Sequence, residues 1–557
     1  MTIISSKHNP FLAEAPPAGE ATGRGSYCYM FPALANDDSH SILPTLTPEK
    51  TYQELDMLRQ VMDSVRFNGN PKTTLPAIYT YFGQFLNHDL TAPIGSMAPL
   101  PGDAHDENVQ HNLALIASRP ELLEIYRQSR VPDTSSILTA IKNQHSKPLA
   151  LESLYGDGPF RDDQTIHPFY RANDPASFQI AETEDVAELV GRNGAPVKRS
   201  PDLPRDPEAK VAKIFDQRND ENLITSQLHL AFMLFHNNAV AVLKKADGGG
   251  RERSLTETRR LFNEARRLVT RHYQWCIVKD YLEHVLAPGS LAKVGNRLPP
   301  GRKVPMEFTV AAFRFGHSMV SDSYDYNEFF GENGIKKNSA DLNAMFLLTS
   351  SRGMTDGRKQ FRQLPSHWVA DWTRLTRMPA PPAAATDKID VVISESMMRL
   401  GTPMNDIKEA AGFRSISALN IFRGFHRRIP CGQALAKELG NKALTPEQIR
   451  KAFTEISDSA YEPLENSGFD TQTPAWVYFL CEASVFGGDK GGGNCLGPTA
   501  SAIVAETIMG LLNQDQESAF KAEAGKWNPE DHSALRTPAG QAVDSIQNFL
   551  RFAGVMP

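Results

Sequence analysis

The chain has 557 residues, of which 41% are hydrophobic and 22% charged, an ordinary composition for a globular protein with a large core. Its formal net charge of −6 gives no reason to expect nucleic acid or an anionic membrane as a partner. The five cysteines are scattered, and neither a secretory signal nor an apolar run long enough for a transmembrane segment is seen, so the sequence predicts a reduced, cytoplasmic protein.

Apolar residues recur at helical spacing along most of the chain. Residues 1–45 are rich in Pro, Gly and Ala and are predicted to form an extended arm. Beyond the arm, the following segments have helical periodicity: 44–66, 79–91, 113–145 (two short helices), 222–243, 256–286, 306–321, 389–400, 417–439, 445–457 and 499–512. Strand-like alternation is almost absent. The predicted fold is therefore mainly α, with few or no strands.

No internal repeat and no clear linker divides the sequence, which favours one large helical domain over two. We expect an N-terminal arm and first helix at 1–65, the main domain at 66–515, and a C-terminal extension at 516–557 packed on the same domain. Long irregular regions are expected where Gly, Pro and Asp cluster, at 147–171 and 193–206.

The helix predicted at 79–91 carries three polar residues on an otherwise apolar background. Gln84 and His88 are four residues apart and share one face, whereas Asp89 is turned about 100° away. Burying polar groups without partners is costly. The three residues are therefore either hydrogen-bonded core residues or a catalytic acid–base group with its helpers.

A second histidine lies in the apolar stretch 310–320, where Phe313, Gly316, His317 and Val320 fall on one side of the expected helix. Gly316 costs roughly 1 kcal/mol of helix stability relative to Ala, so a packing reason is expected, and a flat cofactor against the helix is one. A neutral imidazole on a buried helix can be an axial ligand of haem iron. The alternative is a hydrogen-bonded core histidine.

A polar segment at 216–222 precedes the long helix predicted at 222–243. Asn219 or Asp220 can cap that helix. Arg218 and Glu221 are three residues apart and can reach a common centre. The segment therefore combines a structural signal with a candidate site.

A further apolar helix presents Asn420 and Arg423 on one face. An amide side chain in such a position can accept the second N–H of a ligating histidine and so fix its tautomer. Taken alone, each of these pieces is weak evidence for a site.

Taken together and in this order, four segments resemble the animal-type haem peroxidases, the superfamily of myeloperoxidase, peroxinectin and the cyclooxygenases. The segments are 83–90 (Gly-Gln-Phe-Leu-Asn-His-Asp-Leu), 218–221 (Arg-Asn-Asp-Glu), 313–317 (Phe-Arg-Phe-Gly-His) and 419–423 (Leu-Asn-Ile-Phe-Arg). The similarity spreads evenly over roughly 65–515, and the chain is identified as a bacterial-type member.

The resemblance implies a haem b cofactor and a role for each matched residue. These are the distal histidine His88, the distal amide Gln84, the distal arginine Arg218, the proximal iron ligand His317, its hydrogen-bond partner Asn420 and the propionate-binding Arg423. Hydrogen peroxide has to lose a proton from one oxygen and gain it on the other while the O–O bond breaks. A neutral His88 can make both transfers, and Arg218 would stabilise the charge on the leaving oxygen.

The covalent attachment of haem is expected to differ from that in mammalian members, which esterify haem methyl groups with an aspartate near the distal histidine and a glutamate at the position of Glu221. Gln84 and Asn87 are the residues near His88 here, and neither amide can form that ester. We therefore expect at most one ester link, through Glu221.

Calcium binding is left open by the sequence. Asp89 matches a calcium ligand of the family, but in the partner loop at 147–155 only Glu152 stands out as a charged oxygen ligand. Calcium prefers 6–8 oxygen ligands. A calcium ion bound by Asp89 and Glu152 is one alternative, and an ion pair of Glu152 with a nearby Lys or Arg is the other.

The predicted function is that of a haem-dependent peroxidase, with hydrogen peroxide and a small organic donor or a halide as its partners. A fatty-acid dioxygenase is the first alternative, but such enzymes need a tyrosine three residues before the proximal histidine, where this chain has Arg314. A non-catalytic haem-binding or scaffold protein is the second alternative, and it would show no turnover with peroxide.

Overall fold

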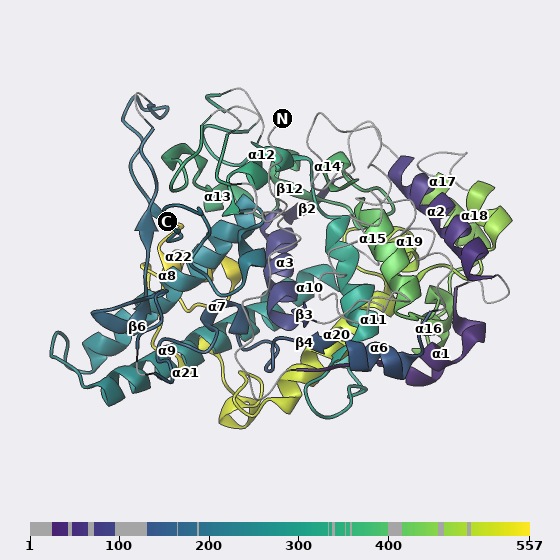
Figure 1. The fold of residues 1–557 in the computed structure, drawn as a ribbon, viewed down its shortest axis with the longest axis horizontal. Helices are drawn as coiled ribbons and strands as arrows, with labels where there is room; N and C mark the ends of the chain where they lie inside the picture. Colours follow the sequence, from purple (N-terminus) through teal and green to yellow (C-terminus); the bar gives the residue numbers. More distant parts are fainter. Residues whose placement is uncertain are drawn as a thin grey trace.

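The computed structural model describes residues 25–42, 47–64, 72–94, 131–163, 165–186, 189–331, 334–336, 340–350, 353–356, 359–398, 415–454, 462–486 and 492–557. Helices dominate the described chain (Figure 1), which confirms the predicted fold class. Several predicted segments lie outside the described residues, namely 1–24 of the arm and 113–130, 399–400 and 455–457 of the expected helices.

The first half of the chain contains two long helices and several short ones. The helices are α1 (Pro32–Asn36), α2 (Pro48–Ser64), α3 (Ile78–Leu90), α6 (Thr134–Ala140), α7 (Glu152–Tyr155), α8 (Leu223–Ala246), α9 (Leu255–Cys276) and α10 (Leu282–Val285). A 3-10 helix, η5 (Gln217–Asp220), precedes α8, and a π-helical turn, η6 (Ile277–Tyr281), joins α9 to α10. The predicted helices at 44–66, 79–91, 222–243 and 256–286 are thereby confirmed.

The second half begins with α11 (Met306–Val310) and the 3-10 helix η8 (Ala312–His317). The helices that follow are α12 (Leu342–Leu347), α13 (Trp372–Leu375), α14 (Glu395–Met398), α15 (Ile416–His426), α16 (Gly432–Glu438), α17 (Pro446–Thr454), α18 (Glu462–Ser467), α19 (Ala475–Phe486), α20 (Pro498–Gln514), α21 (Pro529–His532) and α22 (Ile546–Ala553). None of the described helices is long and apolar enough to cross a membrane.

The strands of the described chain form two-stranded sheets only. β1 (Tyr27–Cys28) pairs in parallel with β9 (Val304–Pro305). The antiparallel pairs are β2 (Lys72–Pro76) with β12 (Ala385–Asp387), β3 (Pro93–Ile94) with β4 (Lys142–Asn143), β5 (Tyr170–Arg171) with β6 (Asp174–Phe178), β7 (Ala181–Glu182) with β8 (Pro201–Asp202), and β10 (Ser323–Tyr324) with β11 (Ala340–Asp341).

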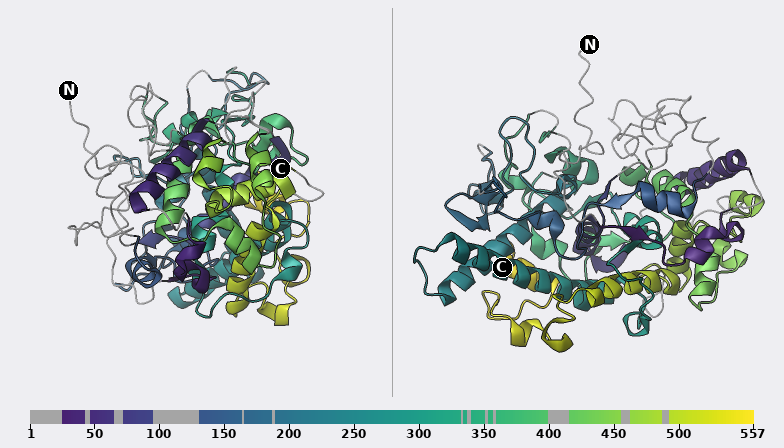
Figure 2. Two further views of the ribbon diagram at one scale, coloured as in Figure 1. Left: turned by 90° about the vertical axis from the view of Figure 1, so that its right-hand side faces the viewer. Right: turned by 60° about the horizontal axis from the view of Figure 1, so that its bottom comes forward.

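Helix α3 lies at the centre of the molecule (Figure 1), between α8 and α22 on one side and α11, α15 and α20 on the other. Figures 1 and 2 place α1 and α2 beside α16 and α18 at one end, whereas α22 and the C-terminus lie beside α8 towards the other. Helix α8 is capped by the side chain of Asn222, which accepts a hydrogen bond from the Thr225 N–H. The predicted caps Asn219 and Asp220 therefore serve another purpose.

The helix predicted at 306–321 is wrong in its second half. The backbone leaves the α-helical region at Ala311 (φ −128°, ψ −65°) and continues as the tighter η8. The Arg314 side chain donates through Nε to the Thr309 carbonyl at 2.8 Å, and that carbonyl would otherwise accept the next α-helical N–H. The side chain thus competes with the helix for the same acceptor.

Two other predicted helices are also corrected. Within 389–398 only α14 is helical, because Ile389 donates its N–H to Gly493 and Asp390 donates its own to Ser318 Oγ, which ties this stretch to other segments. The helix expected at 417–439 divides into α15 and α16, with Arg428 at a positive φ of 49° and Pro430 in the connection.

Helix α19 was not predicted from the sequence. Ala475 to Ala483 are all buried, so its apolar residues run around the whole helix and leave no periodic pattern to detect. It packs against η8, where the Trp476 indole N–H donates to the Arg314 carbonyl at 3.1 Å. A buried apolar helix therefore supports the segment that carries His317.

Candidate active site

The orientation of α3 is set by close packing on two neighbouring elements. Phe85 stacks on Phe232 of α8 with ring centroids 4.4 Å apart. On another side, Gly83 lies against the Tyr281 hydroxyl, and a methyl group at this position would collide with it. These contacts fix the rotation of the helix, so that Gln84 and His88 are presented together on one face.

His88 is fixed by the side chain of Asn219. Its Nδ1 lies 2.9 Å from Asn219 Oδ1, and Asn219 Nδ2 in turn lies 3.0 Å from Nδ1 of His229. Because an amide oxygen only accepts, Nδ1 of His88 carries the hydrogen and Nε2 keeps a lone pair. Burial, followed by the charge of Arg218, lowers the pKa of His88 to about 3. The imidazole is therefore a neutral base at physiological pH.

Arg218 is held rigidly beside His88. Its Nε and Nη2 donate to the two carboxylate oxygens of Asp216 at 2.9 and 2.5 Å. Its remaining donors reach the carbonyl oxygens of Thr91 at 2.7 Å and His88 at 3.0 Å, which ties η5 to the end of α3. Despite burial, the Asp216 charge raises the pKa of Arg218. The site thus has a permanent positive charge next to the base.

Gln84 can present only hydrogen-bond donors to the site. Its Oε1 accepts from Asn222 Nδ2 at 2.8 Å and from Thr225 Oγ1 at 2.9 Å, both at the start of α8. This leaves the NH₂ group as its remaining polar function. Nearby, the Oδ1 atom of Asn87 is buried and has no hydrogen-bond partner among the described residues.

Glu221 follows η5 and has an unusual carboxyl group. Burial raises its pKa to about 8, although the Arg218 charge acts in the opposite direction. No side-chain hydrogen bond of this carboxyl group occurs in the described part of the chain. The carboxyl group of Glu221 is thus more easily protonated than that of an exposed glutamate.

His317 lies at the end of η8 and contacts the Asn420 amide of α15, with 2.8 Å between His317 Nδ1 and Asn420 Nδ2. Burial, then the charges of Arg314 and Arg423, lower the pKa of His317 well below its usual value. In this orientation the amide N–H donates to Nδ1. The role that the family resemblance gives Asn420 needs the other amide orientation, in which Oδ1 accepts from Nδ1–H and the Nε2 lone pair is free to bind a metal.

The surroundings of His317 fit a flat, anionic cofactor. A methyl group built on Gly316 or on Gly424 would meet no other atom within 4 Å, so there is open space beside both η8 and α15. Burial, followed by the charge of Arg423, lowers the pKa of Arg314 to about 9. No described carboxylate forms an ion pair with Arg314. Two clustered guanidinium groups suit the two propionates of haem.

Asp89 and Glu152 do not fit a calcium ion. Asp89 Oδ2 accepts from the Leu151 N–H at 3.1 Å, and both oxygens of Glu152 accept from Ser146, at 2.7 and 2.8 Å. His145 lies between Glu152 and Asp216, 3.7 Å from each. Although burial opposes it, the two nearby carboxylates raise the pKa of His145 to about 9. The protonated ring of His145 therefore supplies, next to Glu152, the positive charge that a calcium ion would otherwise bring.

The structure brings the predicted residues of each side together and adds three that the sequence did not reveal. Asn219 was seen only as a helix cap, and neither Asp216 nor His145 was assigned a role. The signal for Asn219 was its place inside the 218–221 segment, next to the predicted distal arginine. The contact between His145 and Asp216 joins residues 71 positions apart, which no local pattern indicates.

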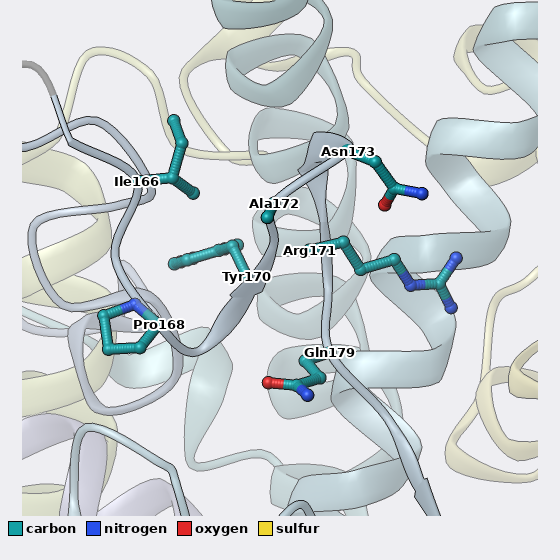
Figure 3. Close-up of a pocket in the computed structure, with 7 residues that line it drawn as sticks. All are labelled: Ile166, Pro168, Tyr170, Arg171, Ala172, Asn173 and Gln179. Carbon is teal, nitrogen blue, oxygen red and sulfur yellow. The ribbon is translucent and has the colours of Figure 1, made fainter.

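A separate pocket of about 360 Å³ lies on the β5–β6 hairpin (Figure 3). It is lined by Ile166, Pro168, Tyr170, Arg171, Ala172, Asn173 and Gln179. None of the predicted site residues belongs to it, so we do not connect it with the chemistry of the two histidines.

The site can be compared with known proteins. A family model described as animal haem peroxidase matches residues 45–364. No curated protein matches the chain in sequence. Among solved structures, peroxidase A from Dictyostelium discoideum is similar, with a TM-score of 0.51 and 16% identity over 88% of this chain and 90% of that chain. At this identity the likeness concerns the fold.

Two plant enzymes are also similar in structure. The fatty acid alpha-dioxygenase of Oryza sativa has a TM-score of 0.49 and 13% identity over 86% of this chain and 76% of that chain. The corresponding enzyme of Arabidopsis thaliana has a TM-score of 0.44 and 14% identity, over 84% of this chain and 71% of that chain.

Proposed function

The chain belongs to the animal haem peroxidase family, and we propose that it is a haem-dependent peroxidase that reduces hydrogen peroxide and oxidises small organic donors or halides. The observation that carries the proposal is a pair of neutral histidines, the buried His88 and the partly buried His317, on the neighbouring elements α3 and η8. Each ring is fixed by an asparagine, Asn219 or Asn420. The bacterial type and the cytoplasmic location stay predictions.

Haem b, when bound, would supply the redox chemistry with peroxide. His317 would hold the iron through Nε2, with Asn420 fixing the ring. Arg423 and Arg314 would pair with the propionates, for which guanidinium groups are well suited. At most one ester bond is proposed, through Glu221, because Gln84 and Asn87 are amides.

On the distal side, the residues are arranged for proton transfer. The Nε2 lone pair of His88 takes the proton from one peroxide oxygen and returns it to the other. The Gln84 NH₂ group donates to a bound oxygen or to a small anion. Arg218 stabilises the negative charge that develops on the leaving oxygen, and its four hydrogen bonds hold that charge in place before the reaction begins.

Arg314 favours a peroxidase over a fatty-acid dioxygenase. It stands three residues before His317, at the position where the dioxygenases of this superfamily need a tyrosine, and its guanidinium is held by the Thr309 carbonyl. An arginine side chain in this place cannot form the tyrosyl radical that attacks a fatty acid.

The proposal is tested with the absorption spectrum of protein expressed with haem supplied, before and after one equivalent of hydrogen peroxide. We expect a Soret band that shifts on peroxide addition and that is lost or displaced in His317→Ala. His272→Ala is the matched control, because His272 is also buried but bonds to Val543 and Ser533. No Soret band in the wild type would overturn the enzyme proposal and favour a scaffold. A band that ignores peroxide would leave haem binding without peroxidase chemistry.

A further inference from the structure

Two stacked tyrosines lead away from the candidate haem site. Tyr281, in η6, is 2% exposed and lies between α3 and η8, with its hydroxyl against Gly83 and its ring centroid 6.4 Å from that of Phe313. The ring of Tyr79, from α3, stacks on Tyr281 at 6.3 Å with an interplanar angle of 13°. Both tyrosines are therefore buried next to elements that carry the distal and proximal histidines.

The hydroxyl of Tyr79 donates a hydrogen bond to Asp280 Oδ1. The other carboxylate oxygen of Asp280 accepts the Ile546 N–H at 2.8 Å, which fixes the carboxylate in this position. A phenol bonded to a carboxylate can lose an electron and pass its proton to the acceptor in one step. This avoids a charged phenol radical cation in the core, where an unpaired charge is costly.

Tyr281 differs from Tyr79 in this respect. Its hydroxyl has no hydrogen-bond partner within the described residues, so no protein group there is placed to accept its proton. Tyr281 can therefore serve as a short-lived relay for the electron, whereas proton transfer to Asp280 stabilises the radical at Tyr79. The order of the pair thus gives the path a direction, away from the haem site.

The path ends close to solvent. The His284 ring lies 5.0 Å from the ring of Tyr79, and its Nδ1 is 2.8 Å from the Asp280 carbonyl oxygen. The side chain of His284 is 33% exposed, whereas that of Asp280 is 10% exposed. Only one partly exposed ring therefore separates Tyr79 from a molecule bound on this surface.

We propose that Tyr281 and Tyr79 carry electrons from a surface site at His284 to the haem, so that phenolic groups on donors too large to enter the distal pocket are oxidised. The inference rests on the proposed peroxidase function, which supplies the oxidant. In each step Tyr79 gives one electron to the peroxide-oxidised haem across Tyr281 and its proton to Asp280. A phenolic donor at the surface then reduces the Tyr79 radical and loses its own proton to water, while Asp280 returns the first proton.

Two such steps complete one turnover. Together they deliver the two electrons that, with two protons, convert one hydrogen peroxide to two water molecules, and each donor leaves as a neutral phenoxyl radical. The oxidised groups of the donor can then couple in solution. No further oxidant or reductant is needed.

The first test is the electron paramagnetic resonance spectrum of the haem-loaded protein, frozen shortly after one equivalent of hydrogen peroxide. We expect a tyrosyl radical in the wild type and a loss of most of that signal in Tyr79→Phe and Tyr281→Phe. Tyr281→Phe removes no hydrogen bond and keeps the ring, so the protein should fold. Tyr326→Phe is the matched control, because the buried Tyr326 hydroxyl bonds only to the Gln227 amide and the Trp368 carbonyl.

The second test compares free phenol with phenol groups attached to a dextran too large to enter the protein. The measured quantity is the rate with dextran-linked phenol divided by the rate with free phenol. We expect this ratio to fall about tenfold in the two path variants, Tyr79→Phe and Tyr281→Phe, which corresponds to about 1.4 kcal/mol in the barrier. The ratio should stay at the wild-type value in Tyr326→Phe.

The outcomes separate this inference from the proposed function. A Soret band that responds to peroxide without any tyrosyl radical, a radical that persists in both path variants, or an unchanged ratio of rates would overturn the path while the peroxidase proposal stands. A Soret band that does not respond to peroxide would overturn both, because the oxidant of Tyr79 would not form.

Discussion

Among single residues, Asn219 determines which nitrogen of His88 carries the hydrogen. Its amide oxygen faces Nδ1 of His88 and its amide nitrogen faces His229, so neither ring can change its tautomer without losing a hydrogen bond. Asn219 is completely buried, and a substitution here acts on His88 through position and protonation rather than through contact with substrate. Asn219 is therefore a positioning residue.

We predict that Asn219→Leu slows the reaction with peroxide by about 10–100-fold, the usual cost of losing such a partner. In the wild type the rate should be constant from pH 8 to about pH 5 and fall only as the pH approaches about 3, because His88 must be neutral and its pKa is lowered to about 3. The hydrogen bond to Asn219 favours the protonated ring, so the acid limb should move to lower pH in the variant. Stopped-flow measurement of the Soret shift at a series of pH values gives both the rate with peroxide and the pH at which that rate falls.

The control for this experiment is Asn327→Leu, which removes another buried amide that bonds to the carbonyl groups of His367 and Val369. It should lower stability and leave the peroxide rate of the folded protein unchanged. A wild-type rate that falls with a midpoint near pH 6.5 would contradict the assignment of a base with a strongly lowered pKa.

The sequence made individual site residues predictable where a motif linked them to a family. His88, Gln84, Arg218 and His317 were singled out in this way. The structure places His88 and Gln84 on α3, Arg218 against the end of α3, and His317 on the neighbouring η8. Asn219 is a different case, because Asn is also common at helix starts and this local explanation hid its contact with His88. Long-range hydrogen bonds leave no trace in local sequence.

At the scale of elements, the loop before α7 contains a buried charge chain instead of a metal site. His145 lies between Glu152 and Asp216, and Asp216 holds Arg218 through two hydrogen bonds. The loop thus connects to the distal arginine through side chains alone. A calcium ion would have to displace the protein donors that now satisfy Asp89 and Glu152.

We predict that EGTA leaves the denaturant-unfolding midpoint of the protein unchanged, because protein groups already satisfy these carboxylates. In contrast, His145→Leu should lower the free energy of unfolding by up to about 3 kcal/mol, since two partly buried carboxylates lose the cation between them. His367→Leu is the matched control, because the buried His367 ring packs on Phe329 and Phe330 and has no carboxylate beside it in the described chain.

A fall in the midpoint on EGTA addition that calcium reverses would show that the loop holds a metal after all. Metal analysis of the purified protein gives an independent readout.

Helix α2 was predictable because one of its faces is buried and the other is exposed. The prediction of helices failed where contacts with other segments, rather than the apolar periodicity of the sequence, determine the local structure. Arg314 takes a carbonyl from the helix expected at 306–321, and α19 is buried on all sides and shows no period. Both failures lie next to His317. The candidate site is therefore packed against segments whose secondary structure could not be predicted from the local sequence pattern.

At the scale of the whole molecule, the two chain ends pack on the central helices from different directions. In α22, Phe549 stacks on Phe235 of α8 at 4.0 Å, and the Asn238 side chain donates to the Phe552 carbonyl at 2.8 Å. We therefore propose that 516–557 belongs to the same domain as the main part, as the sequence predicts. The boundaries at 65 and 515 are likewise kept as proposals.

The N-terminal strand is docked by a single buried carboxylate. Glu307 of α11 accepts the backbone N–H groups of Met30 and Phe31 at 2.9 and 3.0 Å, next to the pairing of β1 with β9. The strand places Tyr27 near Arg218 and Arg314, whose charges oppose the effect of burial on the pKa of Tyr27. The Tyr27 hydroxyl has no hydrogen-bond partner in the described structure. The strand therefore reaches the cationic region of the candidate haem site.

We predict that Glu307→Ala releases this strand, with a loss of about 1–3 kcal/mol for each N–H group left without its acceptor. Hydrogen exchange at 27–31 should accelerate, and haem should dissociate faster because Tyr27 no longer covers the cationic region. Glu506→Ala is the matched control, since Glu506 is also buried and accepts two backbone N–H groups, those of Gly295 and Arg297, at a distance from the strand. It should cost similar stability and leave exchange at 27–31 unchanged. Equal haem dissociation rates in both variants would mean that the strand stabilises the fold without contributing to cofactor retention.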